Sequence, residues 1–247
     1  MNLDFFDSNA QVGRFGAPEK EHYFEPAELQ AKLSACGIRR ALVFHALAKE
    51  LHPAEGNRAL MEAISGLPDL VACWVAMPHH TGEMPPPAQF VNEMQQVGAR
   101  AVRLFPATHN YSLAEWCAGE MLEEFEARRV PVFIEAGQTN YDQLAKVLEH
   151  HPKLRLIVMQ TSYRCDRYVY PLMERFENFA LETSSYLPAG GIEAICRRFG
   201  ASRLVFGTGA PYFEPGAAVA SIAFAEISDQ DKQMIASGNL EKLLRWE

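Results

Sequence analysis

Short apolar runs alternate along the chain with longer segments in which apolar residues recur every three or four positions. The short runs are typical of strands in a parallel sheet that helices cover, and the longer segments are typical of amphipathic helices. The predicted strands are Leu3–Phe6, Arg40–His45, Val71–Ala76, Ala101–Leu104, Val132–Glu135, Arg155–Met159, Phe179–Leu181 and Leu204–Phe206. The predicted helices between them are Glu25–Cys36, Ala54–Ser65, Ala88–Val97, Glu115–Arg128, Tyr141–His150, Arg167–Phe176 and Ile192–Phe199.

The regular spacing of these elements, about 25–30 residues per strand and helix, indicates consecutive βαβ units. An open doubly wound sheet would show the same alternation, but eight units in 247 residues favour a single (β/α)8 TIM barrel. No Pro-, Gly- or Ser-rich linker divides the chain, so we expect one domain over residues 1–247. The segment Pro78–Pro87 is predicted to be a loop over the end of the third strand.

Charge and composition exclude several classes of partner. The net charge of −8 argues against nucleic acid and against an anionic membrane surface, because both require clustered Lys and Arg. No apolar run approaches the ~20 residues of a membrane span, and no basic region precedes an apolar stretch at the start, so we expect no signal peptide. The five cysteines show no Cys-x-x-Cys spacing and are expected to be free thiols of a cytoplasmic protein.

Polar residues at the strand ends are the candidates for chemistry, because the active site of a TIM barrel lies at the C-terminal ends of its strands. Such residues follow or end nearly every predicted strand. They include Asp7, Asn9, Gln11, His45, Arg103, Glu135, Gln160, Glu182, Thr183, Ser184, Thr208 and Gly209.

Five separated segments resemble, in the right order, the amidohydrolase-related branch of the metal-dependent hydrolases. The segment Asp7–Gln11 lies where that family has Asp-x-His-x-His, and Arg129–Glu135 and Leu156–Gln160 match strands that end in His. The segment Ser202–Pro211 is similar to the family's Gly-Ser-Asp-x-Pro strand, and Gly238–Leu244 to its closing helix. The resemblance covers essentially the whole chain and implies a TIM-barrel hydrolase.

The residues at the positions where the resemblance implies metal ligands are of other types. They are Asn9 and Gln11 in place of two histidines, Glu135 and Gln160 in place of two more, and Gly209 in place of an aspartate. Zinc takes His, Cys, Asp or Glu ligands, and amide oxygens bind it weakly. We therefore expect no metal at this centre and no cofactor.

Arg103 and Glu135 end adjacent predicted strands and are the sharpest candidates. A carboxylate in the barrel mouth can act as a general base, and an arginine can hold a substrate carboxylate through its planar fork. The alternative is an internal Arg103–Glu135 ion pair, which the predicted neighbourhood of the strands favours and which is compatible with substrate binding. We predict that this pair forms the polar centre of the mouth.

His45 is a second catalytic candidate, as acid or base, or else a hydrogen-bonded residue of the wall. Asn9, Gln11 and Gln160 are candidates for binding substrate through their amides, or for filling the centre with hydrogen bonds.

Two further residues complete the predicted substrate-binding set. Arg164, beside Tyr163 and beyond the sixth strand, either binds an anion or is a solvated loop residue. Thr208 follows the eighth strand. We also expect the Asp7 region and the loop Gly207–Pro211 to meet at the same mouth.

Three functions remain open at this point. The first is a hydrolase that attacks an ester, lactone or amide carbonyl without a tightly bound metal. The second is a catalytically inactive barrel that binds a small molecule or a protein partner. The third is a metal enzyme with a relocated site that uses Glu135 with His45 or His79. The expected partner is a small anionic or carbonyl-containing compound, and homo-oligomer formation stays open.

Overall fold

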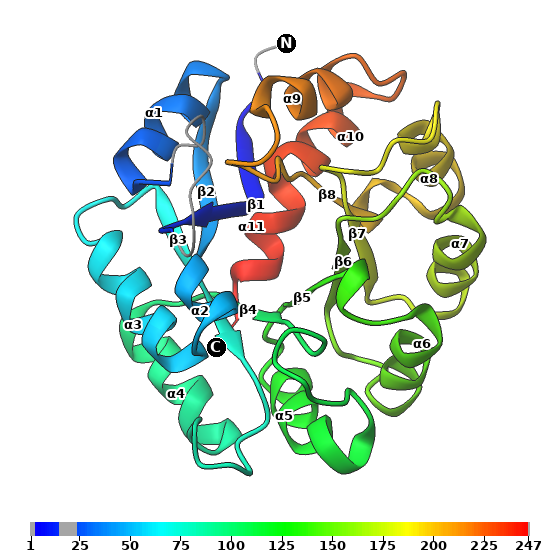
Figure 1. The fold of residues 1–247 in the computed structure, drawn as a ribbon. Coiled ribbons are helices and arrows are strands. Elements are labelled where there is room, and N and C mark those ends of the chain that lie inside the picture. Colours follow the sequence, from blue (N-terminus) through cyan, green and yellow to red (C-terminus); the bar gives the residue numbers. More distant parts are fainter. Residues whose placement is uncertain (1–2, 15–23, 247) are drawn as a thin grey trace.

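The eight strands form one closed parallel barrel with helices around it, as Figure 1 shows. The computed structural model describes residues 3–14 and 24–246. Neighbouring strands pair in chain order from β1 to β8, so the predicted (β/α)8 TIM barrel is confirmed. The strands are β1 (Phe5–Val12), β2 (Ile38–His45), β3 (Leu70–Ala76), β4 (Ala101–Leu104), β5 (Val132–Glu135), β6 (Leu156–Met159), β7 (Phe179–Glu182) and β8 (Leu204–Val205). The predicted domain bounds include residues 1–2, 15–23 and 247, which lie outside the described residues.

All the predicted helices are present, the closing helix that the resemblance implies among them, and the described part of the chain has three further helices after β2 and β8. The helices are α1 (Pro26–Ala35), α2 (Ala46–Glu50), α3 (Pro53–Ala63), α4 (Pro87–Val97), α5 (Glu115–Ala127), α6 (Tyr141–His150), α7 (Asp166–Arg175), α8 (Gly191–Phe199), α9 (Pro215–Ala223), α10 (Asp229–Gln233) and α11 (Asn239–Leu244). In the described part of the chain no helix has the length and apolar character that crossing a membrane requires. The segment between β3 and α4 is a loop, as predicted.

The first strand is longer than predicted, and the prediction that it ends at Phe6 is wrong. It continues to Val12, because its backbone pairs with β2 while its polar side chains face the barrel mouth. The register of β1 against β2 shifts between Asp7 and Ala10. These two residues are three positions apart on β1, but their partners on β2 are only two positions apart. Such a β-bulge changes which face each later side chain occupies.

The barrel closes where β1 meets the short strand β8 and the loop after it. The amide of Ser8 donates to the carbonyl of Phe206 at 3.0 Å, and that of Gln11 to the carbonyl of Ala210 at 2.9 Å. The amide of Gly209 donates to the carbonyl of Asn9 at 2.8 Å. The prediction that the Asp7 region and the loop Gly207–Pro211 meet is therefore confirmed.

Apolar side chains form two layers that alternate along each strand. One layer fills the barrel interior: Leu42 and Phe44 of β2 belong to it, whereas Val43 packs outward against the helices. In a sheet whose successive side chains point to opposite faces, this alternation separates an inner core from the shell between strands and helices. The sequence pattern looked continuous because both layers are apolar.

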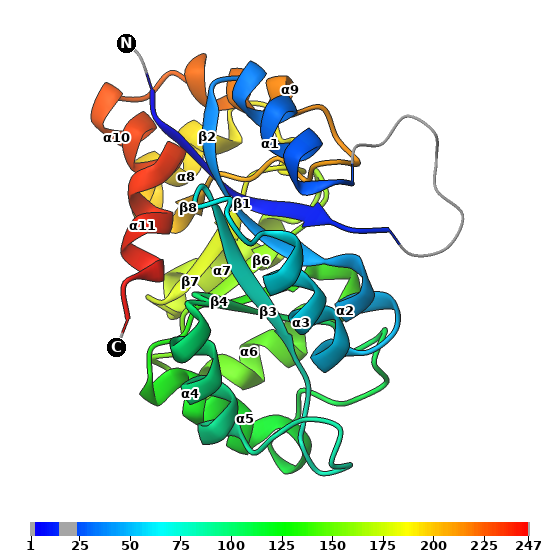
Figure 2. The same cartoon turned by 90° about the vertical axis from the view of Figure 1, so that its left-hand side faces the viewer.

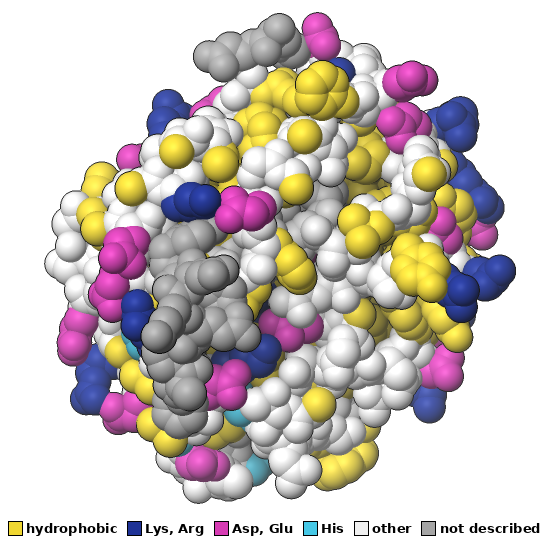
Figure 3. All heavy atoms as spheres, turned by 45° about the horizontal axis from the view of Figure 1, so that its top comes forward, with side chains coloured by type: hydrophobic (Ala, Val, Ile, Leu, Met, Phe, Trp, Pro, Cys, Tyr) yellow, Lys and Arg dark blue, Asp and Glu magenta, His cyan; other side chains and the backbone are white. Residues whose placement is uncertain are grey.

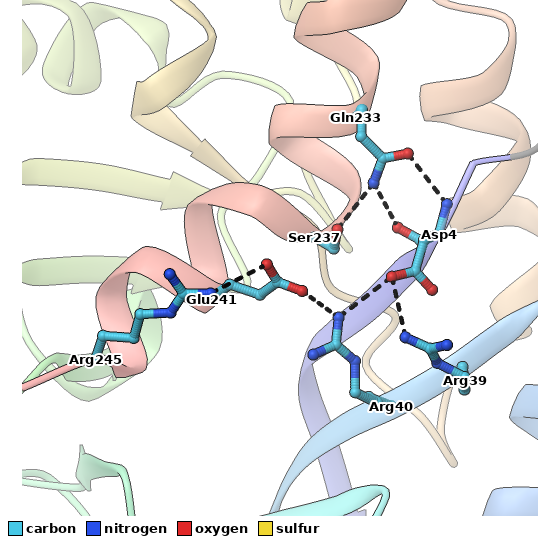
Figure 4. Close-up of polar contacts among 7 residues, drawn as sticks. All are labelled: Asp4, Arg39, Arg40, Gln233, Ser237, Glu241 and Arg245. Carbon is cyan, nitrogen blue, oxygen red and sulfur yellow. Dashed lines mark hydrogen bonds and ion pairs between the residues drawn. The ribbon is translucent and has the colours of Figure 1, made fainter.

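Helix α11 covers the N-terminal end of the barrel, opposite the strand tips (Figure 2). Its Leu240 and Leu244 belong to the interior cluster and are buried. Polar contacts hold it there: Arg40 of β2 donates both to Glu241 of α11 and to Asp4, as Figure 4 shows. The open end of the barrel is thereby left at the C-terminal ends of the strands.

We expect Leu240→Ala to lower the free energy of unfolding by about 2–5 kcal/mol, because it leaves a cavity at a fully buried site between helix and barrel. Urea denaturation would measure this. Leu187→Ala, at a site with 71% of the residue exposed, is the control and should change stability little. Equal losses in the two variants would show that α11 does not seal the barrel.

Candidate functional site

A pocket of about 220 Å³ opens at the C-terminal ends of the strands. It brings together five of the eight residues predicted for the site, drawn from β1, β4, β5 and the residue that follows β6. Tyr212 and Phe213, in the loop after β8, are about half exposed at its rim. Figure 3 views the molecule obliquely from this side, with charged side chains mostly toward the edges of the view. The lining residues are Asn9, Gln11, Phe44, Lys49, Glu50, Arg103, Glu135, Gln160, Gly209, Ala210, Tyr212 and Phe213.

Arg103 places a buried positive charge in this pocket. Its Nη2 donates to Oδ1 of Asn9 at 2.5 Å, and its guanidinium lies 4.2 Å from the ring centroid of Phe44. The residue is only 3% exposed, its Nε has no hydrogen-bond partner, and no described carboxylate lies within ion-pair distance of it. A guanidinium held by an amide oxygen and an aromatic face keeps most of its charge available for an anion.

Glu135 forms an ion pair with Lys49 of α2, at 3.2 Å between Oε2 and Nζ, and the predicted pair with Arg103 is wrong. The reason is the register of the two strands. Arg103 of β4 lies beside Phe133, so Glu135 is two residues nearer the open end of the barrel. Lys49 comes from a helix that the sequence pattern did not predict.

Two buried carboxylates, Asp7 and Glu182, lie next to Asn9 and complete the site. The amide Nδ2 of Asn9 donates to Oε2 of Glu182 at 3.1 Å and to Oγ of Ser184 at 3.2 Å. The carboxylate of Asp7 accepts from both the backbone amide of Thr208, at 2.9 Å, and its hydroxyl, at 2.5 Å. Asn9 therefore connects the guanidinium of Arg103 to the carboxylate of Glu182.

Burial raises the pKa of the Glu182 carboxyl to about 7, with the negative charge of Asp7 adding to the rise. Burial also raises the pKa of Asp7, although the hydrogen bonds from Thr208 and the charge of Arg103 oppose this. Both side chains are fully shielded from solvent. A Cβ added at Gly207 would lie 2.1 Å from Oε1 of Glu182, so only glycine leaves room for this acid.

Residue 209, in the loop after β8, is a glycine, so no side chain fills the pocket at this position. Gly209 has a φ of +73°, and an added Cβ would lie 2.5 Å from the ring of Phe213. Nearby, Nε2 of Gln11 donates to the hydroxyl of Tyr212 at 3.0 Å. Gln160, just beyond β6, also takes a positive φ, of 50°, and lies at the pocket wall.

Three predicted site residues do not line the pocket. His45 ends β2, but its Nδ1 accepts from the amide of Leu47 and so caps α2. Arg164 is exposed, with its guanidinium 5.0 Å from the ring centroid of Tyr163. Thr208 is buried against Asp7 at the barrel seam.

The donor set does not fit the metal centre that the resemblance implies. Within residues 3–14 and 24–246, no group of three or more His, Cys, Asp or Glu side chains is placed to hold a metal ion. The amide oxygen of Asn9 accepts from a cation, and Glu135 is paired with Lys49. A metal ion would compete with both of these positive groups. The same finding applies to the relocated metal site that was considered above. Among the described residues, Glu135 with His45 or His79 does not form a group of ligands that could hold a metal ion.

Lys49 is a part of the site that the sequence did not reveal, whereas Asp7 and Glu182 were strand-end candidates without an assigned role. Glu182 carried the same signal as Glu135, an acidic residue that ends an apolar strand. Asp7 was recognised within the first motif but not given a role. Lys49 had no signal, because its position depends on where a short helix turns back over the mouth.

The chain belongs to the amidohydrolase family, whose sequence model matches residues 17–246. No curated protein sequence matches it. Among solved structures, it is similar to an uncharacterised TIM-barrel protein from Bordetella bronchiseptica, with 17% identity, a TM-score of 0.76 and 98% of both chains covered. It is similar to 2,6-dihydroxybenzoate decarboxylase from Rhizobium, with 15% identity, a TM-score of 0.70 and 98% of both chains covered. It is also similar to 4-oxalomesaconate hydratase from Rhodopseudomonas palustris, with 14% identity and a TM-score of 0.70. The match covers 97% of this chain and 95% of the hydratase chain.

We expect the contribution of Glu182 to the stability of the protein to fall as pH rises through the range between about 4.5 and 7. The folded Glu182 holds its proton to a higher pH than the unfolded residue, so the folded state binds more protons in this window. The Glu182→Gln variant should show a flatter dependence of unfolding free energy on pH, measured by urea denaturation between about pH 5 and 8.

The control for this comparison is Glu123→Gln, on the exposed side of α5. It should keep the wild-type dependence on pH. A Glu182→Gln variant that also keeps it would show that the carboxyl titrates normally in the folded protein.

Proposed function

We propose that the protein is a metal-independent hydrolase that acts on a small anionic compound with an ester, lactone or amide carbonyl. The observation that carries this proposal is Arg103, a buried guanidinium in a small pocket, which forms no ion pair with any carboxylate of the described residues. A buried charge without an ionic partner is costly, and an anionic ligand would relieve that cost.

The pocket supports a ligand of limited size and one negative group. Its volume of about 220 Å³ is smaller than that of sites for drug-sized molecules, which start near 300 Å³. Arg103 would bind a carboxylate of the ligand through two parallel N–H groups, whereas Phe44 and Phe213 would contact its apolar part. Gln11 and Gln160 would supply amide donors or acceptors at the wall.

Glu135 is the base that this geometry favours. Its carboxylate would accept a proton from a water molecule as the water oxygen bonds to the carbonyl carbon. The proton would then pass to the ester oxygen or amide nitrogen as the bond between that atom and the carbonyl carbon breaks. Lys49, at 3.2 Å from Glu135, would stabilise the negative charge that develops on the carbonyl oxygen. Both charged groups lie in one wall of the pocket.

The structural neighbours add support for the ligand class. Two of them are named as a decarboxylase of 2,6-dihydroxybenzoate and a hydratase of 4-oxalomesaconate, and both of these substrates are small carboxylates. Their chains and this one are too distant in sequence to carry over a reaction. What they support is a carboxylate site at the mouth of this barrel.

A barrel that binds the same ligand without turning it over is the second candidate. It is favoured by the ion pair of Glu135, which occupies the carboxylate, and by the fact that no histidine is among the described residues of the pocket. The two candidates share the binding site and differ only in whether Glu135 takes a proton.

Variants of Arg103 and Glu135 separate binding from turnover. Small carboxylates that carry an ester, lactone or amide group should raise the melting temperature of the wild type, and Arg103→Met should weaken this binding about 10- to 100-fold. Glu135→Gln should keep the binding and lose about 10²- to 10⁴-fold in turnover. Arg167→Met, on the exposed side of α7, is the control.

Each alternative outcome has a definite meaning. Binding without product in the wild type would favour the inactive barrel. Binding that survives in Arg103→Met would place the ligand elsewhere and refute the proposal. Arg103→Lys, which keeps the charge and loses the fork, should bind with intermediate strength.

Removal of metal ions should leave the protein unchanged. We expect elemental analysis to find no stoichiometric zinc or manganese, and a chelator to alter neither the melting temperature nor any turnover, because the described donors do not form a metal site. A stoichiometric metal whose removal lowers the melting temperature would refute the metal-independent reaction but not the binding role of Arg103.

A further inference from the structure

A second hollow, of about 920 Å³, lies at the N-terminal end of the barrel, away from the mouth. Its position follows from its walls, which are the starts of three strands and the C-terminal segment around α11 (Figure 2). The lining residues are Arg100, Arg129, Arg155, Gly238, Glu241, Lys242, Arg245 and Trp246.

Three of its arginines converge because they precede neighbouring strands. Arg100 and Arg155 come directly before β4 and β6, and Arg129 comes three residues before β5. The starts of adjacent parallel strands meet at one end of a barrel, about 4.8 Å apart from strand to strand. Lys242 and Arg245 approach the same hollow from α11 and the residues after it.

This positive cluster lacks counter-ions in the described part of the chain. Glu241 is the one acidic residue that lines the hollow, and its carboxylate already accepts from Arg40 and faces Arg245 at 4.0 Å (Figure 4). No described carboxylate lies within 4.0 Å of the cationic groups of Arg100, Arg129 or Arg155. The same is true of Lys242.

The backbone around the cluster is held in place. The guanidinium of Arg155 donates to the carbonyl of Leu243 at 3.0 Å, and the indole of Trp246 donates to the carbonyl of Arg100 at 2.7 Å. Burial and the positive charge of Arg129 lower the pKa of Arg155, so the two guanidinium groups repel each other. An anion between them would remove this repulsion without requiring the backbone to move.

We infer that this hollow is a binding site for a compact oxyanion with several negative charges, such as a diphosphate or a tricarboxylate. The cluster is concentrated at one place on a chain whose net charge is −8, so it is not a consequence of general basicity. Arginine forks suit phosphate and carboxylate oxygens equally, and neither group is favoured by the geometry alone. The site is separate from the mouth and does not depend on the function proposed there.

Isothermal titration of the intact protein with pyrophosphate, citrate and inorganic phosphate, at constant ionic strength, would test the inference. We expect saturable binding of pyrophosphate or citrate that is tighter than that of phosphate. The double variant Arg129→Gln/Lys242→Gln should bind about tenfold or more weakly, because two charge-assisted contacts to the anion are lost, and both residues are exposed on the surface.

The controls distinguish this site from other sources of anion binding. Arg197→Gln removes an exposed positive charge from α8 and should bind as the wild type does. Arg103→Met removes the charge of the mouth and should also leave pyrophosphate binding unchanged.

Three outcomes would overturn the inference. They are no saturable binding of any of the anions, equal weakening in the Arg197→Gln control, and binding that only Arg103→Met removes. Binding of a single-stranded oligonucleotide with no binding of the small anions would replace the compact ligand by a nucleic acid, and would equally contradict the inference.

Discussion

The contact of Asp7 with Thr208 is the constraint on which the rest of the site depends. A parallel barrel closes only if its last strand reaches its first, and β8 contributes just two residues to regular pairing. The carboxylate of Asp7 accepts from the backbone and the hydroxyl of Thr208 and thereby extends the seam beyond β8. Because the seam is fixed there, Asn9 and Gly209 lie side by side at the mouth, with the backbone of one bonded to the other.

Charged groups in the mouth are connected through Asn9. The acid Glu182 accepts from its amide nitrogen, and Arg103 donates to its amide oxygen. Glu135 and Lys49 form a separate ion pair nearer the opening. An amide can link the two charged groups because it accepts from the guanidinium with its oxygen and donates to the carboxylate with its nitrogen. The neutral side-chain amide of Asn9 thus occupies the central position of the mouth. A metal ligand at this position would instead have to direct a lone pair into the pocket.

Most of the fold, but only part of the site, could be predicted from the sequence. The strands Val132–Glu135 and Ala101–Leu104 were predicted with their observed bounds, because buried apolar runs of this length have few alternatives. The first strand was cut short at Phe6, because polar residues that face a barrel interior look like the start of a loop. The predicted Arg103–Glu135 pair does not form, because the two residues are offset by two positions in the register of β4 against β5. No local sequence pattern encodes this offset. Lys49 reaches Glu135 through tertiary structure alone.

The conformation of Gly209 has a consequence for anyone who would redesign this barrel. Its left-handed backbone and the ring of Phe213 against it leave no space for a side chain. Exchanging Asn9, Gln11, Glu135 and Gln160 for histidines would therefore supply four of the five ligands that the resemblance implies, without the aspartate at position 209. The loop from Gly207 to Phe213 would have to be rebuilt first, and since its backbone also closes the barrel, catalytic redesign and structural integrity cannot be varied independently at this position.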